Sequence, residues 1–256
     1  MADLRLDAVS LAFGGLKVLD GVSFETRAGE LLSLIGPNGA GKTSVLNCIC
    51  GLYPPTAGTI HFGTQVLTGK RPHDIAKLGI ARTFQHGELF PHMSVLDNLL
   101  VARHSRINTG IFGEGLFLPA VRRAETEHRH RIEEVLEFVE LERYRHQAVE
   151  GLPFGVQKII GFARALAMDP QVLLLDEPSA GLNREEREDF ARYILRVKHE
   201  LGIAMVWVEH DMQMVADLAD RIFVLNYGVP LAEGTPAEVL NNPAVIAAYL
   251  GNRANS

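Results

Sequence analysis

The segment that most constrains this chain is residues 36–43, which read GPNGAGKT. They fit the pattern G-x-x-x-x-G-K-[ST], in which glycines let backbone N–H groups surround a phosphate. The apolar run Leu31–Ile35 precedes the segment, and the helix-compatible residues 44–47 follow it. This order of strand, loop and helix is the context that the pattern requires. The sequence therefore predicts a phosphate-binding loop and not a chance glycine-rich turn.

The side chains of this loop suggest how it would hold a nucleotide. Lys42 is expected to reach the β- and γ-phosphates, and the Thr43 hydroxyl is expected to hold Mg²⁺. The helix that follows adds the positive end of its dipole. The expected ligands of ATP in this region are Gly36, Pro37, Asn38, Gly39, Ala40, Gly41, Lys42, Thr43 and Ser44.

A second segment ends in two adjacent carboxylates. Residues 172–175 form an uninterrupted apolar run, which suits a central parallel strand, and Asp176 and Glu177 follow it. Ligands of open α/β sheets bind at the C-terminal ends of strands, so both carboxylates are expected beside the phosphate-binding loop. Asp176 is then a candidate ligand of Mg²⁺, and Glu177 a candidate for polarising an attacking water. Pro178 also permits a surface turn or a helix cap here, but the neighbouring loop favours the catalytic interpretation.

The length and charge of the chain exclude some classes of protein. The 256 residues suffice for one large domain or two small ones. A net charge of −6 argues against broad contact with nucleic acid, so no nucleic-acid partner is expected. No run reaches the roughly 18 apolar residues of a membrane span, and the charged N-terminus shows no signal peptide. We expect a chain that is soluble by itself and reaches a membrane only through a partner.

The two cysteines, Cys48 and Cys50, lie on the helix predicted after the loop. At this spacing their side chains point apart, and the sequence holds no further cysteine to complete a metal set. We expect both to be small buried apolar residues of a protein from a reducing compartment.

Hydrophobic periodicity divides the chain into strand-rich and helical parts. Residues 4–35 alternate short apolar runs with glycine turns, as short strands do, and a further strand is expected around residues 59–62. From about Val95 the pattern becomes helical. The glycine-rich segment 107–120 is expected to pack on its own domain rather than on a partner. One apolar helical stripe consists of Ile132, Val135, Leu136 and Val139.

After Gly161, helical stretches alternate with apolar strands at residues 172–175, 203–208 and 222–225. Such alternation implies a mainly parallel sheet with helices on both faces. Residues 235–238, with the sequence TPAE, supply an N-cap, a proline at the first helical position and a glutamate at the third. They predict the start of a terminal helix.

Together with further motifs, these segments resemble an ABC-type ATPase subunit over almost the whole chain. Gln85, in the segment ARTFQ, looks like the Q-loop glutamine, and the pair formed by Asp176 and Glu177 looks like Walker B. Residues 179–183 resemble the D-loop, and residues 208–211 resemble the switch-histidine segment. Any one of these motifs would be weak support, but all of them occur in the order that the family shows.

The resemblance implies an α/β fold with a P-loop NTPase (RecA-like) core, an N-terminal antiparallel β part and an inserted helical subdomain. The chain would be a single ABC ATPase domain over residues 1–256. Its nucleotide-binding core would comprise residues 1–90 and 161–240. Residues 91–160 would form the helical subdomain with the signature segment, and residues 241–256 a C-terminal tail.

The resemblance also assigns roles to single residues. Gln85 would bring an amide oxygen to Mg²⁺, so the expected metal ligands are Thr43, Gln85 and Asp176. His210 would donate to the γ-phosphate and join Glu177 in catalysis, although a lone histidine is usually a satisfied core residue. Phe13 would stack on adenine; the alternative is an ordinary core aromatic residue.

The signature segment departs from the family pattern L-S-G-G-Q. Residues 152–158 read LPFGVQK, so Pro153 replaces the serine and can donate neither a hydroxyl nor an N–H to a γ-phosphate. Leu152, Gly155 and Gln157 remain as expected nucleotide contacts, and a helix over residues 159–168 can still direct its N-terminus at an anion. In the family this segment serves the nucleotide of the opposite subunit. A heterodimer with two unequal sites would accommodate the change, whereas a homodimer would carry two weakened signatures.

Several stretches are similar to ATPase subunits of branched-chain amino acid importers. They include residues 81–90, the insertion through residues 119–124 and the tail at residues 228–251. The resemblance implies ATP and Mg²⁺ as cofactors. It also implies a second, different ATPase subunit, two membrane permeases and, indirectly, a substrate-binding protein. Gln85 to Met93 would contact a permease at the cytoplasmic face of the inner membrane. Urea and lipopolysaccharide transporters, and ABC ATPases without a transport role, stay open as alternatives.

Overall fold

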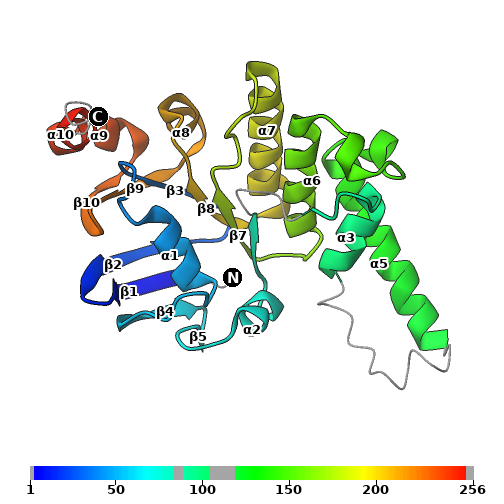
Figure 1. Cartoon of the computed structure of the whole chain (residues 1–256), viewed down its shortest axis with the longest axis horizontal. Helices are drawn as coiled ribbons and strands as arrows, with labels where there is room; N and C mark the ends of the chain where they lie inside the picture. The colour runs from blue at the N-terminus through cyan, green and yellow to red at the C-terminus, as the bar shows by residue number, and fades with distance from the viewer. Residues whose placement is uncertain (1–2, 84–88, 104–118, 252–256) are drawn as a thin grey trace.

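The computed structural model describes residues 3–83, 89–103 and 119–251. Its N-terminal part contains an antiparallel sheet of four strands in the order β2-β1-β4-β5 (Figure 1). Burial alternates from Leu4 to Leu6, and after an irregularity in the register of β1 it resumes at Val9, so one face of this sheet lies on the core. The strands are β1 (Leu4–Phe13), β2 (Leu16–Thr26), β4 (Ala57–Phe62) and β5 (Gln65–Val66).

A second sheet of six strands, in the order β10-β9-β3-β8-β7-β6, forms the centre of the molecule. Its five strands from β9 to β6 are parallel, and β10 pairs antiparallel with β9. Every residue of β3, β7 and β8 is buried, which explains their uninterrupted apolar sequences. The strands are β3 (Leu31–Ile35), β6 (Ile80–Thr83), β7 (Val172–Asp176), β8 (Ala204–Val208), β9 (Arg221–Asn226) and β10 (Val229–Gly234).

The two faces of this sheet pack into different cores. On one face, Leu174 and Val206 join the first sheet and helix α1 (Lys42–Ile49). On the other face, Leu173 and Trp207 contact a layer of helices. The mainly parallel sheet with helices on both faces is therefore confirmed.

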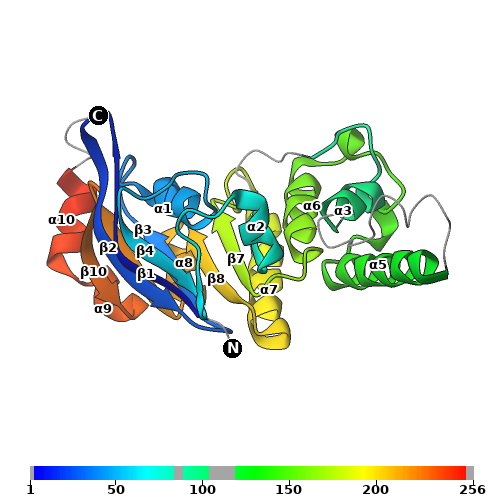
Figure 2. The same ribbon diagram turned by 90° about the horizontal axis from the view of Figure 1, so that it is seen from below.

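The helices of the second layer lie mostly at one end of the molecule, where α3, α5 and α6 gather beyond β7 in both views (Figures 1 and 2). The predicted stripe is confirmed, since Ile132, Val135, Leu136 and Val139 are all buried. Helices α9 and α10 lie at the opposite end beside β10. The helices are α2 (Pro72–Lys77), α3 (Val95–Arg103), α5 (Pro119–Phe138), α6 (Phe154–Leu166), α7 (Arg184–Arg196), α8 (Met212–Leu218), α9 (Pro236–Leu240) and α10 (Pro243–Gly251); shorter helical turns are η2 (Glu142–Tyr144), η3 (Val149–Gly151) and η4 (Val197–Leu201).

Helix starts follow the capping chemistry of the sequence, with one correction. The capping box formed by Thr235 and Glu238 starts α9 as predicted. The helix predicted over residues 159–168 was placed wrongly: α6 begins at Phe154 and ends at Leu166. Pro153 has φ −54° and ψ 149° at the N-cap of α6. An N-cap residue needs no intrahelical N–H, so the proline begins the helix instead of delaying it.

Two further expectations concern the cysteines and the membrane. Cys48 is buried in α1 and Cys50 is half-buried directly after it, and both are free thiols. Within the three described stretches of the chain, no helix is long and apolar enough to cross a membrane. The glycine-rich segment 107–120 and Gln85 lie outside, or almost wholly outside, the described residues.

Candidate functional site

The loop over residues 36–41 connects β3 to α1 at the C-terminal edge of the parallel sheet. Its first residue, Gly36, has φ 153°, and a Cβ atom there would lie 2.1 Å from the carbonyl oxygen of Leu225. No side chain fits at this position. The loop therefore depends on glycine for its close approach to the end of β9.

Lys42, the first residue of α1, turns its side chain back into this loop. Its Nζ donates to the carbonyl oxygens of Gly36 (2.7 Å) and Pro37 (3.1 Å), and the side chain is buried. Burial lowers the pKa of Lys42, while the nearby carboxylates of Glu177 and Asp176 oppose that shift. The loop thus contains a cation held by weak neutral acceptors, which anionic oxygens can replace.

The register of the central strands brings distant segments to one edge. Leu34 of β3 pairs with Val208 of β8, and Val208 pairs with Asp176 of β7. The segments that follow these three strands therefore emerge side by side. This places the loop after β3, the carboxylates after β7 and the histidine after β8 in one location.

Asp176 is almost completely buried, at 2% exposure. Its Oδ2 accepts a hydrogen bond from Arg82 Nη2 at 2.6 Å. Its Oδ1 is also buried, and within the described part of the chain it has no hydrogen-bond partner. One oxygen of this carboxylate is therefore fixed by a cation, and the other lacks, among the described residues, a partner that a ligand would supply.

Glu177 follows with φ 48°, a conformation that non-glycine residues seldom adopt. Its backbone N–H donates to the carbonyl oxygen of Val208 at 2.9 Å. A hydrogen bond of 2.8 Å joins its Oε1 to His210 Nε2. The structure therefore brings the two predicted catalytic residues into direct contact.

Two residues of this region were missed by sequence reasoning. Glu209 is buried, its Oε2 accepts from Ser179 Oγ at 2.7 Å, and its Oε1 accepts from the backbone N–H of His210 at 2.8 Å. It connects the segment after β7 to the segment after β8. An acidic residue directly before the histidine was the signal, but nothing in the sequence showed that its partner lies 30 positions away. Arg82 lies in the ARTFQ segment around Gln85, but this segment gives no sign of its contact with Asp176.

Phe13, the predicted adenine contact, ends β1 with 47% of its surface exposed. Its ring meets the ring of Tyr53 edge to face, with centroids 5.1 Å apart and an interplanar angle of 81°. Tyr53 follows α1 and was also missed. The exposed pair offers an aromatic surface near the end of α1 on which a base can stack.

The signature residues lie in a different part of the molecule. Helix α6, which Pro153 begins, lies on the far side of β7 from α1 in both views (Figures 1 and 2). Gly155 lies against α7, where a Cβ would come within 2.2 Å of a Glu186 carboxylate oxygen. Gln157 Nε2 donates to the carbonyl oxygen of Leu152 at 2.9 Å. The predicted nucleotide contacts thus fall into two groups.

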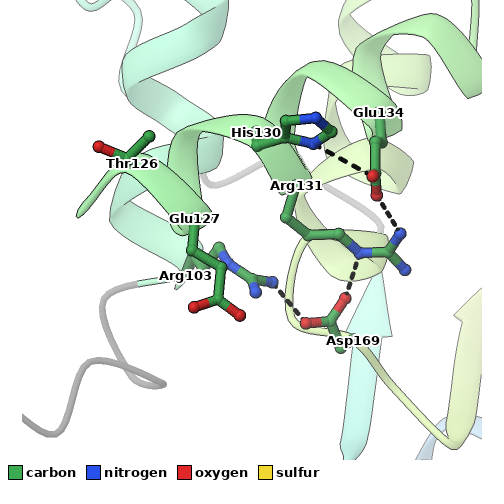
Figure 3. Close-up of a pocket in the computed structure, with 7 residues that line it drawn as sticks. All are labelled: Arg103, Thr126, Glu127, His130, Arg131, Glu134 and Asp169. Carbon is green, nitrogen blue, oxygen red and sulfur yellow. Dashed lines mark hydrogen bonds and ion pairs between the residues drawn. The ribbon is translucent and has the colours of Figure 1, made fainter. Parts of the chain in front are cut away.

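A pocket in the helical part is lined by charged residues of α3, α5 and the turn after α6 (Figure 3). Asp169 Oδ2 accepts from Arg103 at 2.6 Å, and Asp169 Oδ1 accepts from Arg131 at 2.7 Å. These charges satisfy one another and join three elements. We therefore regard this cluster as structural and distinct from the site at the sheet edge.

Two family models match the sequence. The ABC transporter model matches residues 19–180, and the model named "Branched-chain amino acid ATP-binding cassette transporter" matches residues 229–255. The high-affinity branched-chain amino acid transport ATP-binding protein LivG of Salmonella typhimurium is 44% identical over 248 residues, which cover 97% of each chain. BraF of Pseudomonas aeruginosa, which bears the same description, is 41% identical over 249 residues, again 97% of each chain.

Solved structures agree in fold. A nucleotide-free ATP-binding cassette of an ABC transporter is 30% identical, with a TM-score of 0.84 over 97% of this chain and 99% of that one. An ATP-binding cassette in its ADP conformation is also 30% identical, with a TM-score of 0.86 over 98% and 99%. The predicted fold class is confirmed: a P-loop NTPase core with an antiparallel part and an inserted helical part.

Proposed function

This chain belongs to the ABC transporter ATP-binding family, and we propose that it powers an importer of branched-chain amino acids by binding and hydrolysing ATP. One observation carries the choice of substrate class. The C-terminal residues 229–255 match the model specific to branched-chain amino acid cassettes, in addition to the general ATPase match. A sulfate/thiosulfate import protein of Pseudomonas aeruginosa is 36% identical and spans 94% of this chain, but that relative is matched over only 69% of its length.

We infer that the loop of residues 36–44 holds the phosphates of ATP. The two carbonyl contacts of Lys42 keep its ammonium inside the loop, at 2.7 and 3.1 Å. Phosphate oxygens carry full charge and are stronger acceptors than carbonyls, so Lys42 exchanges these contacts for phosphate contacts when ATP binds. Phe13 and Tyr53 provide the stacking surface for adenine. Leu152, Gly155 and Gln157 contact the nucleotide of the opposite subunit.

The residues at the sheet edge fit Mg²⁺. Thr43 is an exposed residue that offers a hydroxyl, and Asp176 offers a buried carboxylate oxygen with no partner in the described residues. Hard cations such as Mg²⁺ prefer oxygen ligands of this kind. When bound, Mg²⁺ would neutralise phosphate charge. Gln85 would add an amide oxygen.

Glu177 and His210 perform the proton chemistry in this proposal. Glu177 directly follows Asp176 in the chain, but its side chain contacts His210. As a general base, Glu177 accepts a proton from the attacking water. His210 Nε2 contacts Glu177 in this structure, and with ATP bound His210 donates to the γ-phosphate. Both residues closely follow the paired strands β7 and β8, which bring their side chains into contact.

The partners follow from the family. We infer a second, different ATPase subunit, two membrane permeases and an associated substrate-binding protein, with this chain at the cytoplasmic face of the membrane. Residues 89–93 and the helices over residues 91–160 would face a permease, and the core of residues 1–90 and 161–240 would bind the nucleotide. Pro153 favours the mixed pair, because a homodimer would repeat the altered signature in both sites.

The decisive experiment is transport. The chain is co-expressed with its partner ATPase and permeases and reconstituted in proteoliposomes with ATP inside or outside. We expect uptake of labelled leucine, isoleucine and valine that requires ATP on the side of this chain. Lys42→Ala should abolish tight ATP binding and uptake, because it removes the cation inside the loop.

A control variant and two alternative outcomes test the parts of the proposal separately. Lys198→Ala is the control for Lys42→Ala and should leave uptake intact, because Lys198 pairs with Asp220 away from the loop. ATP hydrolysis without uptake of any of the three amino acids, together with uptake of urea, would assign the chain to another branch of the family. Unchanged ATP affinity in Lys42→Ala would contradict the role of the loop.

A further inference from the structure

We propose that Arg82 is a positioning residue that aligns the two sides of the metal site. The proposal rests on the proposed function, because it concerns the same Mg²⁺ ligands. The proposal adds Arg82, a residue of β6, to the site. Its role is to hold the carboxylate of Asp176 in a fixed position relative to helix α1, which carries Thr43.

Three elements meet at the Arg82 guanidinium. Nη2 donates to Asp176 Oδ2 at 2.6 Å, and Nη1 donates to Asn47 Oδ1 at 2.6 Å. The side chains of Arg82 and Asp176 are 7% and 2% exposed. A planar guanidinium that uses two nitrogens for two different elements sets both the distance and the angle between them.

A stability role alone explains this pair poorly. Two buried charges lose their hydration, and apolar residues of the same volume often stabilise a fold equally well or better. The charge therefore serves the carboxylate that it contacts.

The geometry on the Asp176 side suits a ligand. Arg82 occupies Oδ2 and prevents the carboxylate from rotating, while Oδ1 stays buried and without a partner in the described residues. A carboxylate with one oxygen fixed presents the other in a single direction. Such outer partners are known to orient metal ligands and to strengthen metal binding.

The contact on the α1 side acts through the helix. Asn47 lies four residues after Thr43, so both side chains are on the same face of α1. The bond from Arg82 to Asn47 therefore limits the rotation of α1 that would turn Thr43 away from Asp176. Arg82 contacts one proposed metal ligand directly and controls the second through its helix.

The test measures binding rather than turnover. Affinity for a non-hydrolysable ATP analogue is determined by calorimetry with Mg²⁺ and with EDTA, and the ratio of the two dissociation constants is the gain due to the metal. We expect Arg82→Met to reduce this gain at least about tenfold, the scale seen for lost outer partners of metal ligands. The affinity in EDTA should change by less than about threefold, because the phosphate loop stays intact. Arg82→Lys should recover part of the gain.

Arg5→Met is the matched control, since Arg5 forms an exposed ion pair with Asp7 on the antiparallel sheet. It should keep the full gain. A full gain in Arg82→Met would overturn the proposal. No gain in the native chain would instead contradict the proposed Mg²⁺ site, so the two failures are distinguishable.

Arg82→Met could also fail to fold, because it leaves a buried carboxylate without a cation. In that case Arg82→Lys and Asn47→Ala test the proposal, since each removes only part of the contacts that join Arg82 to Asp176 and Asn47. Asn47→Ala removes only the contact between Arg82 and helix α1. We expect it to lower the gain in affinity due to Mg²⁺ a few-fold. An unchanged gain in both variants would overturn the proposal.

Discussion

His210 Nε2 lies 2.8 Å from Glu177 Oε1, and the two residues follow neighbouring parallel strands. The contact is possible because Glu177 adopts φ 48° directly after β7, which turns its side chain toward the end of β8. Backbone strain of this kind is found where a side chain must point in one direction. The pairing supports a division of labour in which Glu177 is the base and His210 keeps it in position.

Glu177→Gln is the first test of this pairing. Glutamine keeps the shape and a hydrogen bond to His210 but cannot accept a proton from water. We expect the variant to bind ATP with native affinity and to hydrolyse it at least about a hundredfold more slowly, the scale for losing a general base. Single-turnover hydrolysis with the partner subunit, measured beside equilibrium binding, checks both parts.

The same change at Glu185 provides the control. Glu185 is exposed in the first turn of α7, so Glu185→Gln should hydrolyse ATP at the native rate. Native turnover in Glu177→Gln would move the base to another residue. Loss of ATP binding in that variant would instead indicate that Glu177 holds the loop together.

Pro153→Ser tests the altered signature. Serine restores the hydroxyl that the family pattern has, and Pro153 already occupies the N-cap position of α6, where serine is favoured. We expect hydrolysis by the mixed pair of subunits to rise, and α6 to gain up to about 1 kcal/mol from the new cap. Steady-state hydrolysis and thermal unfolding measure the two effects separately.

Pro153→Ala separates the hydroxyl from the loss of the proline ring. It should show neither the higher turnover nor the added stability. If Pro153→Ser leaves turnover unchanged, the serine of the signature is dispensable in this pair. If Pro153→Ala raises turnover equally, the ring itself was the obstacle.

The features that the sequence predicted well depend on local patterns. The loop of residues 36–43, the buried strand before Asp176 and the capping box at Thr235 can each be recognised from a stretch of about ten residues. The structure agrees with these three predictions because residues close together in the sequence determine each feature. Helix α6 begins earlier than the sequence predicts because proline, although it lacks an N–H, is acceptable at an N-cap.

The contacts that were missed depend on residues far apart in the chain. Arg82 and Asp176 are 94 positions apart, and Ser179 and Glu209 are 30 apart. Only the order and register of β6, β7 and β8 bring these side chains together. One sequence does not fix that register at the level of single atoms. The charged partner of a predicted site residue is therefore what the structure adds.

Asp169→Asn tests the ion-pair cluster of the helical part. Burial would raise the pKa of Asp169, but hydrogen bonds from Arg131 and Arg103 outweigh it and hold the pKa below its usual value. A depressed carboxyl pKa stabilises the fold above the unfolded value of about 3.9 and loses that contribution as pH falls through the folded pKa. Because the side chain is 37% exposed, we expect a loss of only about 1 kcal/mol at pH 7.

The difference between Asp169→Asn and the native chain should shrink as the pH falls from about 4, where the unfolded carboxyl begins to take up a proton, through the lower pKa of the folded carboxyl. Urea unfolding at several pH values measures this. Asn also tolerates the φ of 47° at this position, so the backbone gains no strain. A pH-independent difference would mean that hydrogen-bond geometry, and not charge, carries the effect.

The thiol of Cys48 provides a last test, because its state reports on the packing of α1. Burial raises the pKa of Cys48 to about 12, and burial likewise raises the pKa of Cys50. At pH 8 only about one Cys48 thiol in ten thousand is then ionised, and the thiolate is the reactive form. We expect iodoacetamide to modify neither cysteine appreciably in the native chain within minutes and both in denaturant.

Because the Cys48 thiol is easier to ionise in the unfolded chain, the free energy of unfolding should fall as pH rises above about 8.5, and Cys48→Ala should remove part of that dependence. Rapid native modification of Cys48 would show that α1 opens away from the core between the two sheets, and the phosphate loop that α1 anchors would then be mobile as well.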